Sequence, residues 1–558
     1  MTTMAITQND LEILKSEIMA DTPDGGGLPT GIAVIDRVSN NLFPDVSDID
    51  ALEGRVRLRK VFPSVLTPST DLLQASRVLI TEIPSNPNAS VFMFSATSFA
   101  DRRTDAVEYM NSYTYPQESY RAYYQGKNYK GSYTFKFANQ GEFVPVIGDV
   151  VKVTQLMQKQ IPQTTPIGEV VYFQFLKVTD VLVETPDPQY ATRVVTLTIR
   201  EPLQYDFGGE LDTPELGQAF DIFSTSKNAS LKFYGATKLS APAIIGAEQV
   251  TLLSSKLRIA PSGLSLDSHK VGVDLSRLPS DGLVDLVDVG DLVTITELKS
   301  MQLPTNAPND TFDLGFERLS DVNLVDANDV RVSFDYLNID LDAGTLQLNG
   351  MFDMSGYTAP LTAKYRIMDL GKVASISGQT VNLLNPITHN YTDAAVFSTM
   401  LLMGDMQARA FNVFSQKSWT KEFSDQLIGD RAEAQLQVAN NPIIVTNRDA
   451  IEERWALVFT SPTAFRIVGE TVGEIGTGST TTLTAPINPM TGYPYFTIPV
   501  AAWSTGWSAA NVVRLNTEAA KNPVWFGSAI QQHQIDSLNT YDFTIGYHAN
   551  IDRVRGAA

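Results

Sequence analysis

Apolar and polar residues alternate along much of this chain, and that two-residue period is typical of half-buried β-strands. In residues 51–62 (ALEGRVRLRKVF) Arg55, Arg57 and Arg59 alternate with apolar residues and share one face, and Val56, Leu58 and Val61 lie broadly on the other. We interpret this segment as a strand with one basic face. Such a face is expected to meet carboxylates, in this chain or in a partner, so the three arginines are candidate partner contacts. Phosphate binding is the minority alternative.

Strand patterns also account for most of the remaining chain. Two strands are expected around a Pro/Asn turn, a three-stranded meander follows, and hairpins and further strands fill the second half: 76–97, 143–202, 331–370, 396–424 and 442–547. This distribution predicts a mainly β, multidomain protein built from β-sandwich or small-barrel modules. A short N-terminal helix and few other helices complete the expected fold.

The expected N-terminal helix covers residues 7–19, TQNDLEILKSEIM. Thr7 can cap it, and an apolar stripe follows the helical period: Leu11, Ile13, Leu14 and Ile18. Residues 20–31 contain three successive glycines and predict a flexible hinge. The helix either docks on a neighbouring subunit or packs on its own domain. Shorter helical segments are expected at 101–112 and 431–438.

Residues 113–137 have the most unusual local composition, with seven tyrosines interleaved with four cationic residues and a single acid. We interpret this segment as a β-hairpin arm that turns near Gly126 or Gly131 and packs its tyrosines on both faces. Because a tyrosine ring buries a large area at little entropic cost, four of these residues are candidate partner contacts: Tyr120, Tyr123, Tyr124 and Tyr129. The alternative is that the aromatic and cationic groups stack bases or sugars.

The chain has 558 residues, a length that suggests roughly three to five domains. We expect six segments, namely a docking helix (1–22), a glycine hinge and extended arm (23–70), a β-domain with the tyrosine-rich arm inserted at 113–137 (71–205), a β-rich middle domain (206–315), a hairpin-rich β-domain (316–395) and a C-terminal β-domain (396–558).

Composition excludes several kinds of chemistry. The formal net charge of −20 argues against general nucleic-acid binding, and the absence of cysteine excludes thiol nucleophiles, thiolate metal sites and disulfides. The four histidines occur singly, without metal-ligand spacing: His269, His389, His533 and His548. No continuous apolar run is long enough for a transmembrane helix, and the N-terminus does not read as a secretory signal. No cofactor or metal is expected.

A search for catalytic motifs yields no positive residue. The glycines of 24–31 lack the Lys-Ser/Thr ending of a phosphate loop, and no G-x-S-x-G elbow occurs. The spacing of Asp340, Asp342 and Gly344 suggests a calcium loop only faintly, because the later glutamate is missing. Four tryptophans fall in the last quarter of the chain, where core packing is expected and a carbohydrate platform is the alternative: Trp455, Trp503, Trp507 and Trp525. We therefore expect no enzymatic activity.

Several collinear segments carry a family resemblance. The strongest runs from TNRDAIEERWALVFTSPTAFRIVGE to NPMTGYPYFTIP (446–499), and others are LLMGDMQARAFNVFSQKSWTKEFSD (401–425) and NIDLDAGTLQL (338–348). Together they resemble a family of large virion structural proteins of tailed bacteriophages, whose genes commonly lie in the tail and baseplate region. The tyrosine-rich segment departs from that family.

The resemblance implies a non-enzymatic structural subunit of the virion, made in the host cytoplasm and located in the tail or baseplate. Its implied partners are other copies of itself and neighbouring tail or baseplate proteins, with no direct nucleic-acid contact and no membrane insertion. The alternatives are a receptor-binding or fibre-like module, a neck or head component, and a glycan-degrading tail enzyme.

Overall fold

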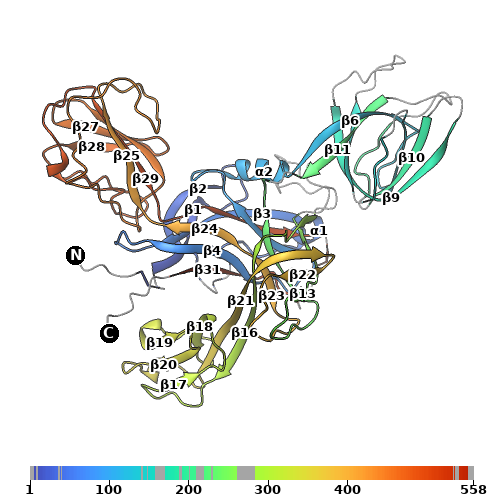
Figure 1. The fold of residues 1–558 in the computed structure, drawn as a ribbon, viewed down its shortest axis with the longest axis horizontal. Helices are drawn as coiled ribbons and strands as arrows, with labels where there is room; N and C mark the ends of the chain where they lie inside the picture. The colour runs from blue at the N-terminus through green and yellow to red at the C-terminus, as the bar shows by residue number, and fades with distance from the viewer. Residues whose placement is uncertain are drawn as a thin grey trace.

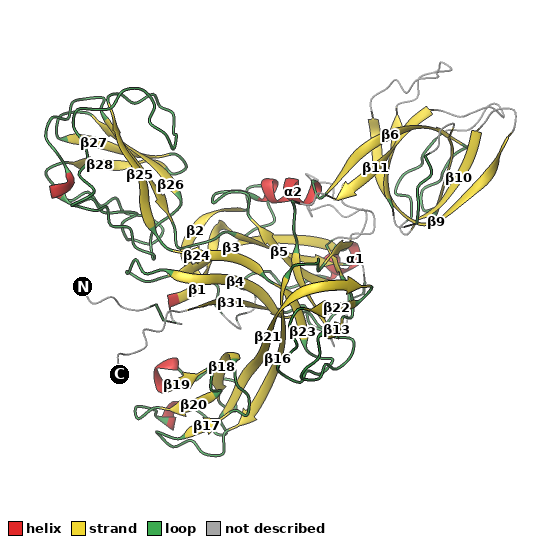
Figure 2. Cartoon of the chain, viewed as in Figure 1, coloured by secondary structure: helices red, strands yellow, loops and turns green. Residues whose placement is uncertain are grey.

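The computed structural model describes residues 6–550 except 8–9, 36–37, 39, 140–142, 148, 157–169, 188–191, 200–201, 209–218, 228–229, 260–282, 532 and 535–538. Strands dominate it and helices are few and short (Figure 2). The mainly β class with a small barrel module is therefore confirmed. Figure 1 shows a central β body from which three smaller modules project in different directions.

The central body is organised by one twelve-stranded sheet. Eleven of its strands form a continuous path, in spatial order β13 (Gln249–Thr251), β22 (Thr380–Leu383), β21 (Thr362–Ser377), β16 (Leu292–Gln302), β23 (Val396–Thr399), β12 (Tyr234–Lys238), β5 (Ala89–Ser95), β30 (Val524–Ile530), β3 (Arg55–Val65), β1 (Leu11–Ile18) and β2 (Gly26–Ala33). The twelfth, β18 (Leu319–Val325), pairs with β21. Because β30 lies between β3 and β5, the two ends of the chain are joined in one sheet.

Further layers cover both faces of this sheet. On one face lies a three-stranded sheet of β24 (Leu401–Met406), β4 (Leu73–Glu82) and β31 (Thr544–Asn550). Ile80 of β4 packs there against Met93 and Phe526 of the large sheet. The opposite face is covered by α2 (Arg103–Asn111) and by the pair β14 (Lys256–Arg258) and β15 (Leu283–Asp285), around Phe94 and Trp525. Burial on both faces explains why β3 is apolar at most positions despite its arginines.

A closed six-stranded barrel forms the first module. Its strands are β6 (Thr114–Tyr124), β7 (Thr134–Asn139), β8 (Val150–Leu156), β9 (Val170–Asp187), β10 (Thr192–Ile199) and β11 (Ala219–Lys227), in the order β10-β7-β6-β11-β8-β9. The expected meander of β8, β9 and β10 is present. The barrel crosses position 205, at which the sequence suggested a domain boundary.

Two other modules flank the body. One contains β17 (Thr311–Asp313), β19 (Leu337–Asp340) and β20 (Thr345–Leu348), with short 3-10 turns at Phe334–Tyr336 and Met354–Gly356. The other is a five-stranded sheet of β25 (Arg409–Gln416), β29 (Val512–Glu518), β26 (Glu453–Phe459), β27 (Ala464–Gly469) and β28 (Gly473–Ser479), with a 3-10 turn at Val500–Ala502. In the latter, Trp455 and Trp507 are buried, which confirms core packing for these tryptophans.

The expected N-terminal helix is wrong, because its residues form β1, which pairs with both β2 and β3. The apolar residues satisfy a strand pattern as well as a helical one, and pairing with β3 decides between them. The glycine hinge is also wrong: Gly26 and Gly27 lie in β2 with φ of 97° and 89°. A Cβ on Gly26 would lie 2.8 Å from the Trp525 ring, so close packing requires glycine there.

Two further helix expectations have opposite outcomes. The helix expected at 101–112 is confirmed as α2, whereas residues 431–438 contain turns and isolated bridges instead of a helix. An additional short helix, α1 (Asp48–Glu53), begins at a capping box formed by Ser47 and Asp50. The tyrosine-rich hairpin exists, but β6 and β7 pair through only two residue pairs, and both strands are walls of the barrel. The segment is therefore not a free arm.

Candidate functional site

The basic face of β3 is occupied within this chain. Arg59 and Arg57 are 4% and 2% exposed. Arg59 Nη1 lies 2.8 Å from Asp21, and Arg55 Nη1 lies 2.5 Å from Asp50. Arg57 donates hydrogen bonds to the Pro44 carbonyl and to Ser528 Oγ, and burial lowers its pKa to about 10. Arg55 and Arg59 meet carboxylates as expected. Arg57 and Arg59 are buried and present no surface to a partner, which corrects that interpretation.

The four candidate tyrosines of the barrel lie in different environments. Tyr124 is 1% exposed, donates a hydrogen bond to the Thr154 carbonyl and stacks on Phe220, so its interpretation as a partner contact is wrong. Tyr120 stacks on the Phe143 ring at 3.8 Å, and Tyr123 is half-buried on the β6–β11 ladder. Tyr129 is 62% exposed. Of the four, Tyr129 alone presents most of its ring to solvent.

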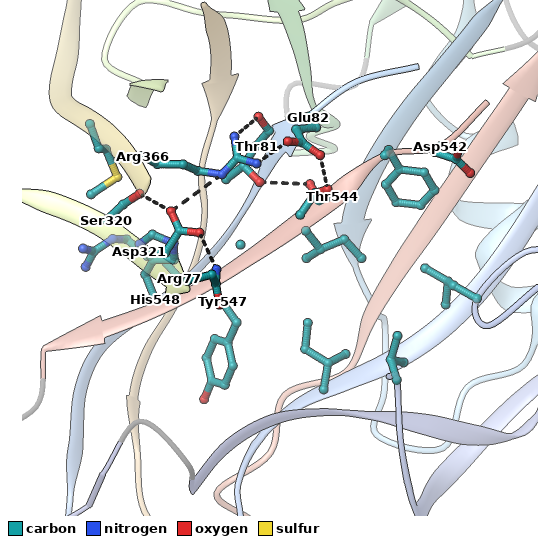
Figure 3. A pocket seen from close by; sticks show the side chains of 18 of the residues that line it. Arg77, Thr81, Glu82, Ser320, Asp321, Arg366, Asp542, Thr544, Tyr547 and His548 are labelled. Carbon is teal, nitrogen blue, oxygen red and sulfur yellow. Dashed lines mark hydrogen bonds and ion pairs between the residues drawn. The ribbon is translucent and has the colours of Figure 1, made fainter. Parts of the chain in front are cut away.

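The described part of the chain encloses a large open cavity of about 1510 Å³. It opens between β4 and β31 on one side and β18 and β21 on the other (Figure 3), and residues 34, 35, 38 and 40–46 form a further wall. Apolar side chains such as Val34, Phe43 and Ile545 line one part of it, while charged groups gather at the β4–β21 side. The cavity therefore combines an apolar wall with a charged one.

Arg366 of β21 is the centre of the charged wall. It forms ion pairs with Glu82 and, at 3.6 Å, with Asp321, and its Nη1 donates to the Thr81 carbonyl. Thr544 of β31 donates in turn to Glu82 (Figure 3). Burial raises the pKa of the Asp321 carboxyl, although Arg366 acts in the opposite direction. This network links β4, β18, β21 and β31, so its groups have a structural role in joining two sheets.

Arg77 of β4 has a different environment from Arg366. It lies opposite His548 of β31 in the ladder, and its Nη1 donates to the Ala75 carbonyl at 3.3 Å. Its Nε is buried without a hydrogen-bond partner, and Arg77 forms no ion pair with any described residue. Burial, Arg77 and Arg366 together lower the pKa of His548 to about 4. The imidazole is therefore neutral near pH 7.

A second polar cluster surrounds Asp369 at the edge of the cavity. Its carboxylate accepts hydrogen bonds from the hydroxyls of Thr388 (2.6 Å) and Tyr391 (3.0 Å), and His389 Nδ1 lies 3.3 Å away. The hydrogen bond with Asp369 raises the pKa of His389. In a hydrolytic triad the histidine bridges nucleophile and carboxylate through opposite nitrogens. Here Nδ1 faces both Thr388 and Asp369, and Nε2 contacts the Glu317 carbonyl, so this geometry does not assemble a nucleophile.

The remaining candidates from the sequence form hydrogen bonds within this chain, where the structure describes them. The Asp340 carboxylate accepts the backbone N–H groups of Asp342 and Ala343 in its own turn. His533 contacts Asn86 and Tyr541, and His269 lies outside the described residues. Across the described part of the chain no cluster of three metal-ligating side chains occurs. No helix there is long and apolar enough to cross a membrane.

Sequence reasoning missed Arg77, Arg366 and His548. The available signal was a charged residue inside an otherwise apolar strand, as in KYRIMDL around Arg366. That signal cannot show which strands face one another across a cavity. Comparison with known proteins adds no assignment, because no protein-family model and no curated protein matches this chain.

Proposed function

We propose that this chain is a structural subunit of a tailed-phage virion, acting in the tail or baseplate through protein–protein assembly. One observation carries the proposal beyond the sequence resemblance. The strands contributed by both chain ends form one buried central sheet, and three modules project from it (Figure 1). A stable centre with several outward modules suits a subunit that contacts several neighbours at once. The proposed partners are copies of this chain and adjacent tail or baseplate proteins.

Exposed apolar side chains on the modules and on the body support this proposal. In the C-terminal module Leu483 and Ile487 are 60% and 52% exposed, and in the barrel Val146 and Ile147 are 63% and 67% exposed. Ile244, beside the outer end of the large sheet, is 70% exposed. Single exposed apolar residues are common on monomers, but neighbouring ones on separate modules are suited to buried cores of protein interfaces.

Antibody labelling of intact particles tests the proposal directly. An antibody raised against residues 440–558 is expected to label the distal end of the tail in electron micrographs. Quantitative mass spectrometry of the same particles is expected to find several copies per virion. Label at the neck or head would reassign the subunit to that region. Absence of the protein from both intact and disrupted particles would refute a structural role.

A further inference from the structure

We propose that a hairpin tip in the C-terminal module, together with the adjoining end of β2, forms an uncharged docking surface through which two copies of this chain associate about a two-fold axis. This surface, the neutral tip, consists of Ile32, Ile487, Met490 and Tyr493, and each of these side chains is at least 47% exposed. The inference rests on the proposed function, in which copies of this chain are partners, and it identifies the surface at which two copies meet.

The neutral tip is built on a hairpin whose two arms are residues 484–488 and 493–498. Isolated bridges pair the arms, and Asn488, which is 3% exposed, closes the turn between them. Its backbone N–H donates to the Tyr493 carbonyl at 2.7 Å, and its Oδ1 accepts the Met490 N–H at 2.9 Å. The exposed side chains of the turn are therefore held on a defined backbone, so burying them against a partner costs little conformational entropy.

The turn of this hairpin lies against the central body at β2. A Cβ on Gly31 would lie 3.0 Å from the Met490 carbonyl oxygen, so the two backbones approach closely. Ile32, the next residue of β2, is 61% exposed and extends the apolar surface from the module onto the body. The core of the module also includes Leu14 and Phe62 of the body. The neutral tip is thus anchored both by its own hairpin and by the body.

The stretch that contains this hairpin has no ionisable side chain. Residues 475–513 include no Asp, Glu, Lys, Arg or His, although 19% of the residues in the chain are charged. One charged group reaches the surface from another segment, since the Arg448 guanidinium lies over the Tyr493 ring at 5.2 Å. Depletion of charge, with exposed aromatic, methionine and stacked arginine side chains, is the composition of the buried centre of protein interfaces.

The charge of the whole chain indicates which partner suits such a surface. Two copies, each with a formal net charge of −20, repel one another. A basic partner would be attracted to the acidic surfaces of this chain and would gain nothing from an uncharged one. A partner with the same acidic excess can approach closely where neither surface carries acidic groups. A second copy meets this condition when the neutral tips face each other, which is the isologous contact of a two-fold dimer.

Sedimentation velocity of the full chain tests this contact. Wild-type protein is expected to form dimers as its concentration rises. Met490→Glu and Met490→Lys each place like charges opposite one another across the two-fold axis, so each is expected to weaken the association constant by more than about tenfold. An equimolar mixture of these two variants is expected to regain dimers, because opposite charges then face each other.

Met351→Lys is the matched control, because it adds the same charge at a 71% exposed methionine of the module that contains β19 and β20. It is expected to dimerise like wild type, and all variants are expected to melt like wild type, since the substituted positions are exposed. A wild type that stays monomeric, or Met490 variants that dimerise like wild type, would overturn the proposal. A mixture of the two Met490 variants that stays monomeric would overturn the two-fold arrangement.

The solution measurement and the particle labelling distinguish this contact from the proposed function. Monomeric purified protein together with labelled tails refutes the contact and leaves the proposed function standing. Absence of the protein from particles refutes the proposed function, whatever the association state of the purified protein.

Discussion

At the scale of single residues, Lys60 shows how this fold accommodates charge in its core. Its side chain is fully buried, and Nζ lies 2.5 Å from the Asp101 carboxylate and donates to the Phe99 carbonyl at 2.8 Å. Asp101 also accepts hydrogen bonds from the Thr97 backbone and the Trp525 indole. Burial lowers the pKa of Lys60, and Asp101 acts in the opposite direction. The ion pair of Lys60 and Asp101 connects β3 to the segment that leads into α2.

Replacing Lys60 is expected to lower the free energy of unfolding strongly. Lys60→Met leaves the Asp101 carboxylate buried without its counter-ion, and loss of one member of a buried pair typically costs about 3–5 kcal/mol. Urea denaturation should therefore show a large loss of unfolding free energy. The double variant Lys60→Met/Asp101→Asn should recover part of it, because the uncompensated charge is gone. The exposed pair of Arg466 and Glu474 is the control, and its loss through Arg466→Gln is expected to cost about 0–1 kcal/mol. Equal effects at both sites would contradict the account of Lys60.

At the scale of elements, the segment carrying His389 connects β21 to the module that contains β19 and β20. Its imidazole contacts the Asp369 side chain of β21 and the Glu317 carbonyl beyond β17. Because the hydrogen bond with Asp369 raises the pKa of His389, the protonated ring is favoured in the folded state. The contact therefore contributes stability that is fully present below the unfolded pKa of about 6.5. That contribution is lost as pH rises through the folded pKa.

Hydrogen exchange can measure this dependence locally. After correction for intrinsic exchange rates, protection of the backbone in 386–391 is expected to fall as pH rises from 6 through the raised pKa of His389. In His389→Gln the protection should be lower at pH 6 and nearly independent of pH over the same range. His533→Gln, which alters a histidine away from this segment, serves as the control. Unchanged pH dependence in His389→Gln would contradict the proposed role of the imidazole.

The N-terminal strands provide a second prediction at the element scale. β1 covers the edge of β3, whose side chains are buried at all but the first position. Deletion of residues 1–33 would expose a long apolar strand edge, and such edges promote aggregation. We expect this truncation to be insoluble or aggregated in size-exclusion chromatography, whereas deletion of residues 1–5 should leave a soluble protein. A soluble, folded 34–558 fragment would instead support a detachable N-terminal segment.

At the scale of the whole molecule, the modules differ in their dependence on the central body. Among the described residues, those that form the barrel core all lie between 120 and 222. Both ends of this insertion lie together, since the Tyr113 and Phe233 rings are 5.4 Å apart. The core of the C-terminal module, in contrast, includes Leu14, Phe62 and Leu73 from the body. The barrel is therefore a self-contained insertion, while the C-terminal module shares its core with the centre.

Deleting each module in turn should distinguish the self-contained barrel from the C-terminal module that shares its core with the body. Replacing residues 115–226 by a short glycine–serine linker is expected to lower the melting temperature of the remainder by less than about 4 °C, the shift that about 1 kcal/mol produces in large domains. Replacing residues 409–518 in the same way should prevent folding, because it leaves the shared apolar surface of the body uncovered. Calorimetry and circular dichroism check both outcomes. A remainder without the barrel that fails to fold would show that the barrel is not self-contained.

The sequence by itself determined the local part of this structure. Alternation predicted β3, the meander of β8 to β10 and the hairpin of β19 and β20, because a two-residue period depends only on which face a strand buries. Tertiary structure decided between helix and strand at Leu11–Ile18, where the apolar residues fit both periods and only the β3 edge selects the strand. It also decided that Arg57 and Tyr124 are buried and that Arg77, Arg366 and His548 share one cavity. These contacts join residues that lie from tens to hundreds of positions apart, and strand pairing over such separations leaves no local pattern to read.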